Sequence, residues 1–246
     1  MFDKRHKDGP ELGSQVNGHA AFDRFADEYD AELEAALEVS GEDRAYFAKG
    51  RVALLGQSLD DLRESPKRGL DFGCGVGTTA PLLREQFGLD QIVGVDVSPR
   101  SIELAQRDAG SGNCRFRVMN EYEPDGTIDL AYCNGVFHHI PLSERKAAVG
   151  YVYRALRPGG LFALWENHPW NPGTRYVMAK CVFDKDAVPL KPSESRYLLS
   201  DGGFQILRTD FAFIFPRFLK ALRPLEKPLH KLPLGAQYQV LARKPG

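Results

Sequence analysis

Short apolar runs and amphipathic stretches alternate through the middle of the chain. The runs are typical of strands buried on both faces, and the stretches repeat their apolar residues at helical spacing. The pattern predicts core strands near 69–73, 92–97, 115–119, 128–133 and 160–166, separated by helices near 79–87, 99–108 and 143–156. This alternation favours a parallel sheet whose crossovers are right-handed.

Both ends of the chain depart from this alternation. Residues 1–17 are rich in charge, Gly and Pro, and we expect them to form a disordered arm. Apolar residues at helical spacing predict two helices before the core, over 21–39 and 42–62. After the core, the pattern predicts a helix over 192–201, a long strand over 204–215 and a final strand over 236–242.

The first core strand ends in glycines at alternate positions, Gly73, Gly75 and Gly77, and a helical pattern follows directly. Glycine is needed where the backbone takes a positive φ or where a ligand comes close. The next strand ends in Asp96, where a parallel neighbour would present a carboxylate to ribose hydroxyls. The G-x-G-x-G spacing differs from the dinucleotide fingerprint G-x-G-x-x-G, and a plain tight turn is the alternative.

Four segments of this chain resemble the class I S-adenosylmethionine (SAM) dependent methyltransferases, in that family's order and spacing. They are LDFGCGVGTTAPLL, VGVDVSPRSIELA, IDLAYCNGVFHHIP and YRALRPGGLFALWEN, and they span about residues 69–168. The resemblance implies an α/β fold with a doubly wound, seven-stranded, mostly parallel sheet. Helices would cover both faces, and the last strand would be antiparallel. N-terminal helices and a basic, aromatic C-terminal insertion would form a cap.

The resemblance also implies one SAM-binding domain over 18–246. Its parts would be N-terminal cap helices over 18–65, a cofactor-binding core over 66–168, and substrate-side elements with the final strands over 169–246.

The cofactor implied is SAM, which leaves as S-adenosylhomocysteine (SAH). Asp96 suits the ribose diol because one carboxylate accepts two hydroxyl hydrogen bonds. Arg51 could meet the SAM carboxylate, but we expect this arginine to be solvated. The full set of expected cofactor contacts is Tyr29, Asp71, Gly73, Cys74, Gly75, Asp96, Val97, Asn120, Glu121, Cys133 and Asn134. Val97 would face the adenine, and Asn120 or Glu121 its amino group.

The expected catalytic residues are His138, His139 and Glu166, which follow the fourth and fifth core strands. Either histidine could serve as general base, because an ordinary imidazole titrates near neutral pH. The alternative for the histidines is packing. Glu166 could be a base, orient a histidine or cap the next turn. No third ligand stands near the two histidines in the sequence, so we expect no metal site.

Composition limits the remaining classes of function. The 246 residues are 43% hydrophobic and 26% charged, which is ordinary for a soluble globular protein, and a net charge near −1 argues against bulk binding of nucleic acid. Four cysteines without a C-x-x-C pair suggest neither a zinc site nor a disulfide framework. Neither a secretory signal nor a membrane-spanning apolar run is visible, so we expect a cytoplasmic protein.

A basic stretch near the C-terminus, residues 208–244, carries a net charge of +6 with interleaved aromatic and aliphatic residues. It could form a lid over the substrate, a peripheral membrane contact or a homodimer contact through 208–235. The function expected is methyl transfer to an O or N atom of a small molecule. The alternatives are an NAD(P)-dependent oxidoreductase and a non-catalytic SAM-binding or interaction protein.

Overall fold

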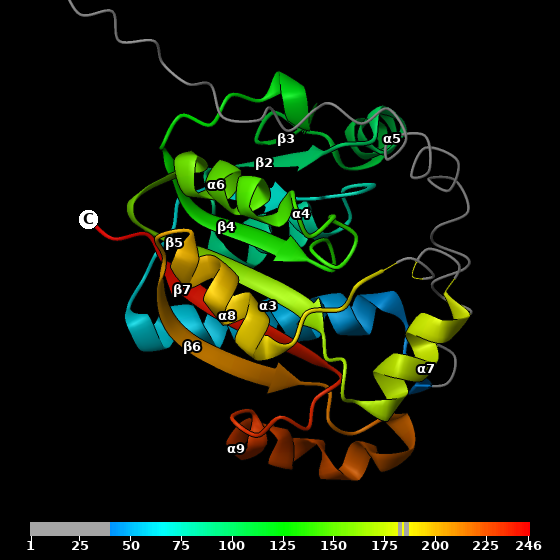
Figure 1. The fold of residues 1–246 in the computed structure, drawn as a ribbon. Helices are drawn as coiled ribbons and strands as arrows, with labels where there is room; N and C mark the ends of the chain where they lie inside the picture. Colours follow the sequence, from blue (N-terminus) through cyan, green and yellow to red (C-terminus); the bar gives the residue numbers. More distant parts are fainter. Residues whose placement is uncertain (1–39, 182–183, 185–186) are drawn as a thin grey trace, which may run out of the picture.

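The computed structural model describes residues 40–181, 184 and 187–246. Its seven strands form one sheet in the order β3-β2-β1-β4-β5-β7-β6 (Figure 1). The strands are β1 (Arg68–Phe72), β2 (Gln91–Asp96), β3 (Cys114–Val118), β4 (Ile128–Asn134), β5 (Leu156–Asn167), β6 (Gln205–Ala212) and β7 (Gln237–Arg243). Of these seven, β7 alone runs antiparallel to its neighbours, β5 and β6. The predicted fold class is confirmed.

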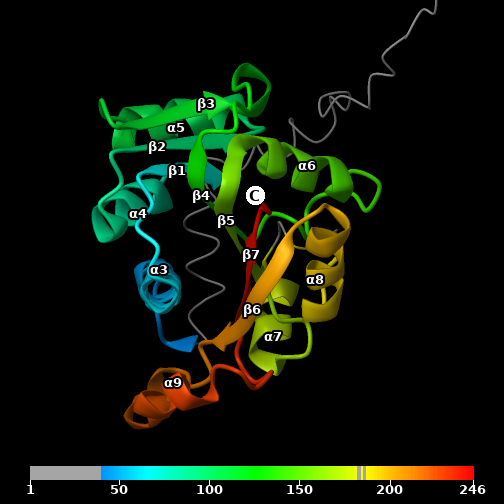
Figure 2. The same ribbon diagram turned by 90° about the vertical axis from the view of Figure 1, so that its left-hand side faces the viewer.

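Helices cover both faces of the sheet, as Figure 2 shows with α3 and α4 on one side and α6 and α8 on the other. Each face has its own apolar cluster, one built with Leu55 and Leu83, the other with Val152 and Leu199. The helices are α3 (Arg44–Leu62), α4 (Thr79–Phe87), α5 (Pro99–Ala109), α6 (Arg145–Ala155), α7 (Pro172–Lys180), α8 (Pro192–Asp201) and α9 (Glu226–Leu229). Two 3₁₀ helices, η2 (Met119–Glu121) and η4 (Arg217–Leu225), complete the described elements.

Local side chains fix where several of these helices begin. Ser98 caps α5 by accepting a hydrogen bond from the Ser101 amide, and Pro99 occupies the first helical position. Asn171 caps α7 in the same way, by accepting from the Thr174 amide. The helix α7 is not among the elements predicted from apolar periodicity; its signal lies in the capping pair Asn171-Pro172.

The predicted long strand over 204–215 ends early, at Ala212. Phe213 has a φ of 63°, which breaks the pairing with β7. Its ring then packs against Tyr46 and Phe47 at the start of α3, and Gly50 leaves room for it there. The chain after β6 is therefore anchored to the first turn of α3.

The disordered arm over 1–17, the helix over 21–39 and Tyr29 lie outside the described residues. The helix expected over 42–62 is α3, which begins at Arg44 with Asp43 as its cap. No helix within the described ranges has both the length and the apolar character needed to cross a membrane.

Candidate active site

The glycine loop, residues 73–77, follows β1 and packs directly against the loop that follows β4. Gly73 has a φ of 71°, and a Cβ added there would lie 2.3 Å from Cγ2 of Val136. Gly75 also has a positive φ, 53°, but a Cβ there would meet no described atom within 4 Å. Gly73 thus permits close contact between two loops, whereas Gly75 leaves one side of the glycine loop open.

The backbone N–H groups of Gly73, Cys74 and Gly75 in the glycine loop are already used within the protein. Those of Gly73 and Cys74 donate to the Val95 carbonyl, at 2.8 and 3.0 Å. The Gly75 amide donates to Oδ2 of Asp96 at 2.9 Å, and the Ser98 amide donates to Oδ1 at 2.9 Å. The Asp96 carboxylate therefore holds the glycine loop to the start of α5. Each of its oxygens has a second lone pair, so the carboxylate can also accept from a ligand.

Two buried oxygen atoms lie at the carboxyl ends of β1 and β4 without a described hydrogen-bond partner: Oδ2 of Asp71 and Oδ1 of Asn134. These strands are adjacent, and the strand order reverses between them. Such a switch point is where open α/β sheets bind ligands. Burial, and then the charge of Asp96, raise the pKa of Asp71 to about 7, against the opposing effect of Arg51. A cation placed beside these oxygens would be stabilised.

Arg51 is buried, so the expectation that it is solvated is wrong. Its side chain donates from Nε to the Tyr132 hydroxyl at 3.1 Å and from Nη1 to Oε1 of Gln237 at 3.0 Å. Arg51 shares one face of α3 with Leu55 and Leu59, which pack on the sheet. Its position on that apolar face is the sequence signal that could have identified it.

Both cysteines of the predicted cofactor set have a raised thiol pKa, caused first by burial. Cys74 belongs to the glycine loop, and Cys133 is fully buried in β4, paired in register with Phe72. A neutral thiol can shape a binding site but is a poor nucleophile. Neither cysteine is therefore a candidate for covalent chemistry.

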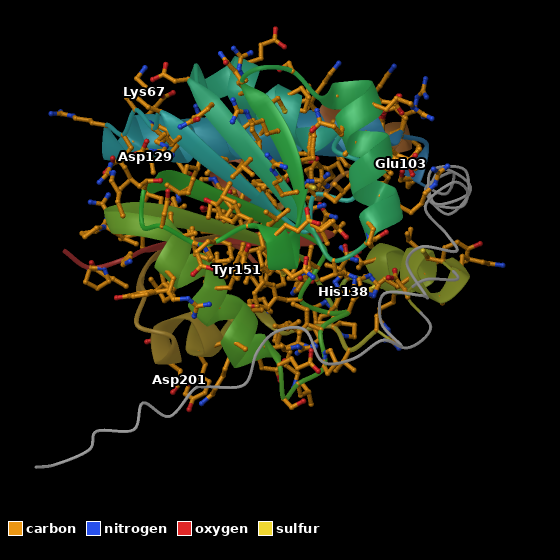
Figure 3. The ribbon with its side chains drawn as sticks, turned by 90° about the horizontal axis from the view of Figure 1, so that it is seen from above. Lys67, Glu103, Asp129, His138, Tyr151 and Asp201 are labelled. Atoms are coloured by element: carbon orange, nitrogen blue, oxygen red, sulfur yellow. The ribbon has the colours of Figure 1, made fainter. Side chains whose placement is uncertain are left out.

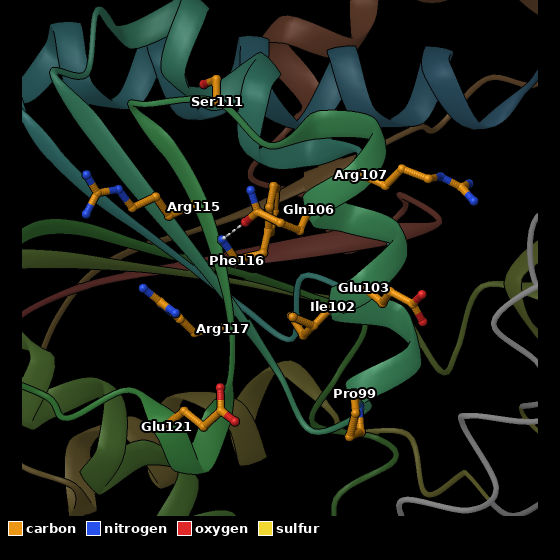
Figure 4. Close-up of a pocket in the computed structure, with 10 residues that line it drawn as sticks. All are labelled: Pro99, Ile102, Glu103, Gln106, Arg107, Ser111, Arg115, Phe116, Arg117 and Glu121. Atoms are coloured by element: carbon orange, nitrogen blue, oxygen red, sulfur yellow. Dashed lines mark hydrogen bonds between the residues drawn. The ribbon is translucent and has the colours of Figure 1, made fainter.

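The residues expected near the adenine are spread over a wider region than those at the carboxyl ends of β1 and β4. Val97 is half-buried against the core, whereas Asn120 and Glu121 are exposed on η2. Glu121 lines a groove of about 760 Å³ along α5 and the edge strand β3, together with Ile102 and Arg117 (Figure 4). This groove contains neither the glycine loop nor the residues after β4, so it lies away from the switch point.

The histidine loop, residues 135–141, is held by Glu166 at the carboxyl end of β5. Oε1 of Glu166 accepts from the Phe137 amide at 2.8 Å, and Oε2 lies 2.6 Å from Nδ1 of His138. Both Glu166 and His138 are buried. Figure 3 places His138 at the opposite end of the sheet from Lys67 and Asp129. Glu166 therefore orients a histidine instead of capping the turn that follows it.

The two histidines have opposite pKa shifts. Burial lowers the pKa of His138, but the charge of Glu166 and the contacts with Asp184 outweigh it and raise the value to about 10. For His139, burial and the positive charge of His138 lower the pKa to about 4. The neighbouring rings, with centroids 4.1 Å apart, thus occupy different electrostatic environments.

Asp184 joins this cluster from a distant part of the chain. Its Oδ1 lies 3.5 Å from Nε2 of His138 and 3.5 Å from Nε2 of His139. The following segment is tied to the same loop, because the Val188 amide donates to the His138 carbonyl at 2.8 Å. Arg145 fixes both, donating to the carbonyls of Ile140 at 3.0 Å and Val188 at 2.7 Å. The sequence shows no third ligand beside the histidines, but the fold supplies a candidate.

The structure therefore brings the three expected catalytic residues together, with Asp184 in addition. Asp71, Gly73 and Asn134 belong to the adjacent strand ends and glycine loop. Asn120 and Glu121 lie further along, after β3.

Comparison with known proteins agrees with this geometry. The family described as a methyltransferase domain matches residues 70–160. Demethylmenaquinone methyltransferase of Thermus thermophilus is 28% identical over 129 residues, 50% of this chain and 58% of that protein. Trans-aconitate 2-methyltransferase of Streptomyces coelicolor is 33% identical over 112 residues, 43% of this chain and 36% of that protein. The chain thus spans between about a third and three fifths of the curated relatives' length.

Solved structures show the same fold at low sequence identity. The N-methyltransferase NodS of Bradyrhizobium japonicum, in complex with SAH, superposes with a TM-score of 0.63 at 16% identity, covering 94% of this chain and 100% of that one. A SAM-dependent methyltransferase of Thermotoga maritima gives 0.61 at 19% identity, covering 92% and 99%. The family match thus identifies residues 70–160 as a methyltransferase domain, in the region where the four motif segments resemble the class I SAM-dependent methyltransferases, and the solved structures show that the fold is the same.

Proposed function

We propose that this protein transfers the methyl group of SAM to an oxygen or nitrogen atom of a small-molecule acceptor. The observation that carries the proposal is the close packing of the glycine loop on the histidine loop at Gly73 and Val136. This contact joins the groups suited to the cofactor and the groups suited to the acceptor at one edge of the sheet. A binding module would need only the first of these two sets.

The residues at this edge fit the polar groups of SAM. The unpartnered oxygens of Asp71 and Asn134, described above, suit an ammonium group. The buried guanidinium of Arg51 suits a carboxylate, and Asp96 suits the ribose diol. Because the N–H groups of Gly73, Cys74 and Gly75 are used internally, this part of the loop would meet the cofactor through its carbonyl groups and its open side at Gly75.

The other cofactor contacts are proposed from the family resemblance and from position. Val97 would face the adenine, and either Asn120 or Glu121 would bind its amino group. Cys74 and Cys133 would line the crevice as neutral thiols. Tyr29, outside the described residues, stays a prediction.

When bound, SAM supplies a methyl group activated by a positive sulfonium. The acceptor attacks the methyl carbon in line with the carbon–sulfur bond. The bond from acceptor to carbon forms, the carbon–sulfur bond breaks, and its electron pair stays on the sulfur of neutral SAH. Alignment of the two reactants can supply about 7–11 kcal/mol of the barrier. The protein's main task is therefore to hold the acceptor in line.

A hydroxyl or protonated amine must also lose a proton. We assign this task to the histidine loop. His139, whose lowered pKa keeps its ring neutral, would accept the proton, and His138, which stays protonated, would be positioned beside it by Glu166. Support comes from their place after β4, beside the glycine loop, and from the contact of both Glu166 oxygens with that loop. Glu166 thus acts through another residue and is proposed as a positioning residue.

The acceptor is proposed to be a small organic molecule. The relatives at the level of sequence are named for trans-aconitate and demethylmenaquinone. The net charge near −1 argues against nucleic acid as the acceptor or partner. A structural neighbour from Haloferax volcanii was solved with the Trm112 methyltransferase activator, with a TM-score of 0.62 at 16% identity.

We also infer a contact surface on the segment 208–235, where a membrane surface or a second copy of the chain could bind. Phe218 is 80% exposed, and Leu222 and Leu225 are 40% and 51% exposed, beside Lys220 and Lys227. Co-sedimentation with anionic vesicles and light scattering separate the two partners, and Phe218→Ser should weaken whichever contact occurs. A protein that stays monomeric and does not bind the vesicles would contradict this inference.

The proposed activity is tested by incubating the protein with SAM and a metabolite extract, followed by mass spectrometry. We expect one methylated product and SAH in equal amounts, and much less of both with Asp96→Ala at a limiting SAM concentration. SAM binding without a product would favour a non-catalytic SAM-binding protein. Binding of NAD without binding of SAM would favour an oxidoreductase.

A further inference from the structure

His138, His139 and Asp184 converge in a way that is suited to a metal ion. One ligand atom from each residue lies within 4.8 Å of the other two, and Oδ1 of Asp184 is 3.5 Å from Nε2 of both histidines. In tetrahedral zinc sites with bonds of about 2.0–2.2 Å, ligand atoms are about 3.3–3.5 Å apart. Two of the three ligand separations therefore already have the required length, and the third is no longer than 4.8 Å.

We propose that these three side chains bind a divalent transition-metal ion such as Zn²⁺. Two histidines and a carboxylate, with a position left for a further ligand, form a known type of catalytic metal site.

The contact between Glu166 and His138 is independent support. Metal-binding histidines usually donate their second ring N–H to a carboxylate, which fixes the tautomer and the ring orientation. Nδ1 of His138 lies 2.6 Å from Oε2 of Glu166, and the exposed fractions of the two side chains are 3% and 0%. With Nδ1–H donated to Glu166, the lone pair of Nε2 is directed toward Asp184.

The charges and anchors of the cluster also favour a cation. A bound ion would displace the proton that His138 holds; with both imidazoles then neutral, Glu166, Asp184 and the nearby Arg145 carry a net charge of −1. The Arg145 guanidinium binds the carbonyls of Ile140 and Val188, so it holds the two ligand-bearing segments together. The three ligands are thus positioned before any ion arrives.

The site is partly open, as a catalytic ion requires. The side chains of His139 and Asp184 are 17% and 11% exposed, so a small molecule can reach a bound ion from that side. Resting on the proposed function, the metal would take the acceptor's oxygen as its further ligand. Coordination would lower the pKa of a hydroxyl, so that its proton could pass to solvent. With an ion bound, the two histidines would serve as ligands, and the ion would replace them as the means of removing the proton. Hydroxyl-bearing small molecules are then the favoured acceptor class.

Calorimetry of the chelator-treated protein with Zn²⁺, and absorption spectra with Co²⁺, test the proposal. We expect one equivalent of either ion and the visible bands of a four- or five-coordinate cobalt site. His139→Ala and Asp184→Asn should each weaken binding at least 100-fold. Glu166→Gln keeps all three ligands and should weaken binding about 10–100-fold. The control variants His230→Ala and Asp201→Asn, far from the cluster in sequence, should bind like the parent.

Equal affinity in the parent, His139→Ala and Asp184→Asn would show adventitious binding and overturn the site. Absence of binding by the parent would overturn it as well. Thermal unfolding and SAM titration of each variant show whether the protein remains folded. A protein that binds SAM and yields a methylated product but binds no metal would disprove the metal site while leaving the proposed function intact. A protein that binds Zn²⁺ but not SAM would disprove the proposed function while leaving the metal site intact.

Discussion

The proposed cofactor side and the proposed acceptor side of the site are assembled in different ways. The glycine loop and Asp96 lie within 24 residues of sequence, on two adjacent strands, and are joined by the bond from the Gly75 amide to Asp96. The acceptor side combines the histidine loop after β4, Glu166 on β5 and Asp184 beyond α7. Local sequence thus specifies the first site, whereas only the completed fold forms the second.

Gly73→Ala should affect both sides and have the largest effect. The added Cβ would collide with Val136 at 2.3 Å, at a φ of 71°. Overpacking and positive φ together predict a loss of about 2–4 kcal/mol in unfolding free energy, and SAM binding should become undetectable. Denaturant unfolding and calorimetry measure the two effects.

Gly75→Ala is the matched control, because it has a positive φ without the collision. Its loss of unfolding free energy should be nearer 1 kcal/mol. Equal losses for the two variants would show that the contact between the loops does not matter.

Asp96→Ala should affect the cofactor side alone. Hydrogen bonds to a charged group contribute about 1.5–3 kcal/mol, so SAM should bind about 10–100-fold more weakly. His139→Ala, on the acceptor side, should leave SAM affinity within about twofold. If His139→Ala weakened SAM binding as much as Asp96→Ala, the two sides would not be separable.

Glu166→Gln should affect the acceptor side alone. We expect turnover to fall about 10–100-fold while SAM affinity stays unchanged, because the amide cannot replace the carboxylate that orients His138. Glu166→Asp is expected to restore part of the activity if orientation is its role. Unchanged turnover in Glu166→Gln would leave Glu166 as an anchor for the loop and nothing more.

The pH dependence of SAM affinity should report on Asp71. Burial and Asp96 raise the pKa of Asp71 to about 7 in the free protein, and a bound ammonium would favour the ionised carboxylate. Below pH 7 binding must therefore displace a proton, so affinity should fall by up to about tenfold per pH unit, and it should be constant above pH 7. In Asp71→Asn this slope should vanish. A slope that persists in that variant would assign it to another group.

Sequence patterns predicted the core well because its signals are local. The start of α5 follows from Ser98-Pro99, and the end of β1 follows from the glycines. Arg51 was misjudged because its burial depends on how α3 packs across the sheet. Asp184 was missed because it lies 46 residues after His138 in the sequence, and only the folded chain after α7 brings it close. The early end of β6 at Ala212 similarly depends on the contact of Phe213 with α3.

A crystal structure with SAH tests the central claim most directly, namely that the cofactor lies at the switch point with its sulfur facing the histidine loop. We predict that the ribose hydroxyls contact Asp96, and that the amino-acid end lies within reach of Asp71, Asn134 and Arg51. The sulfur should be directed toward His138 and His139. Density in the groove along α5 and β3, or a sulfur directed away from the histidines, would contradict the account.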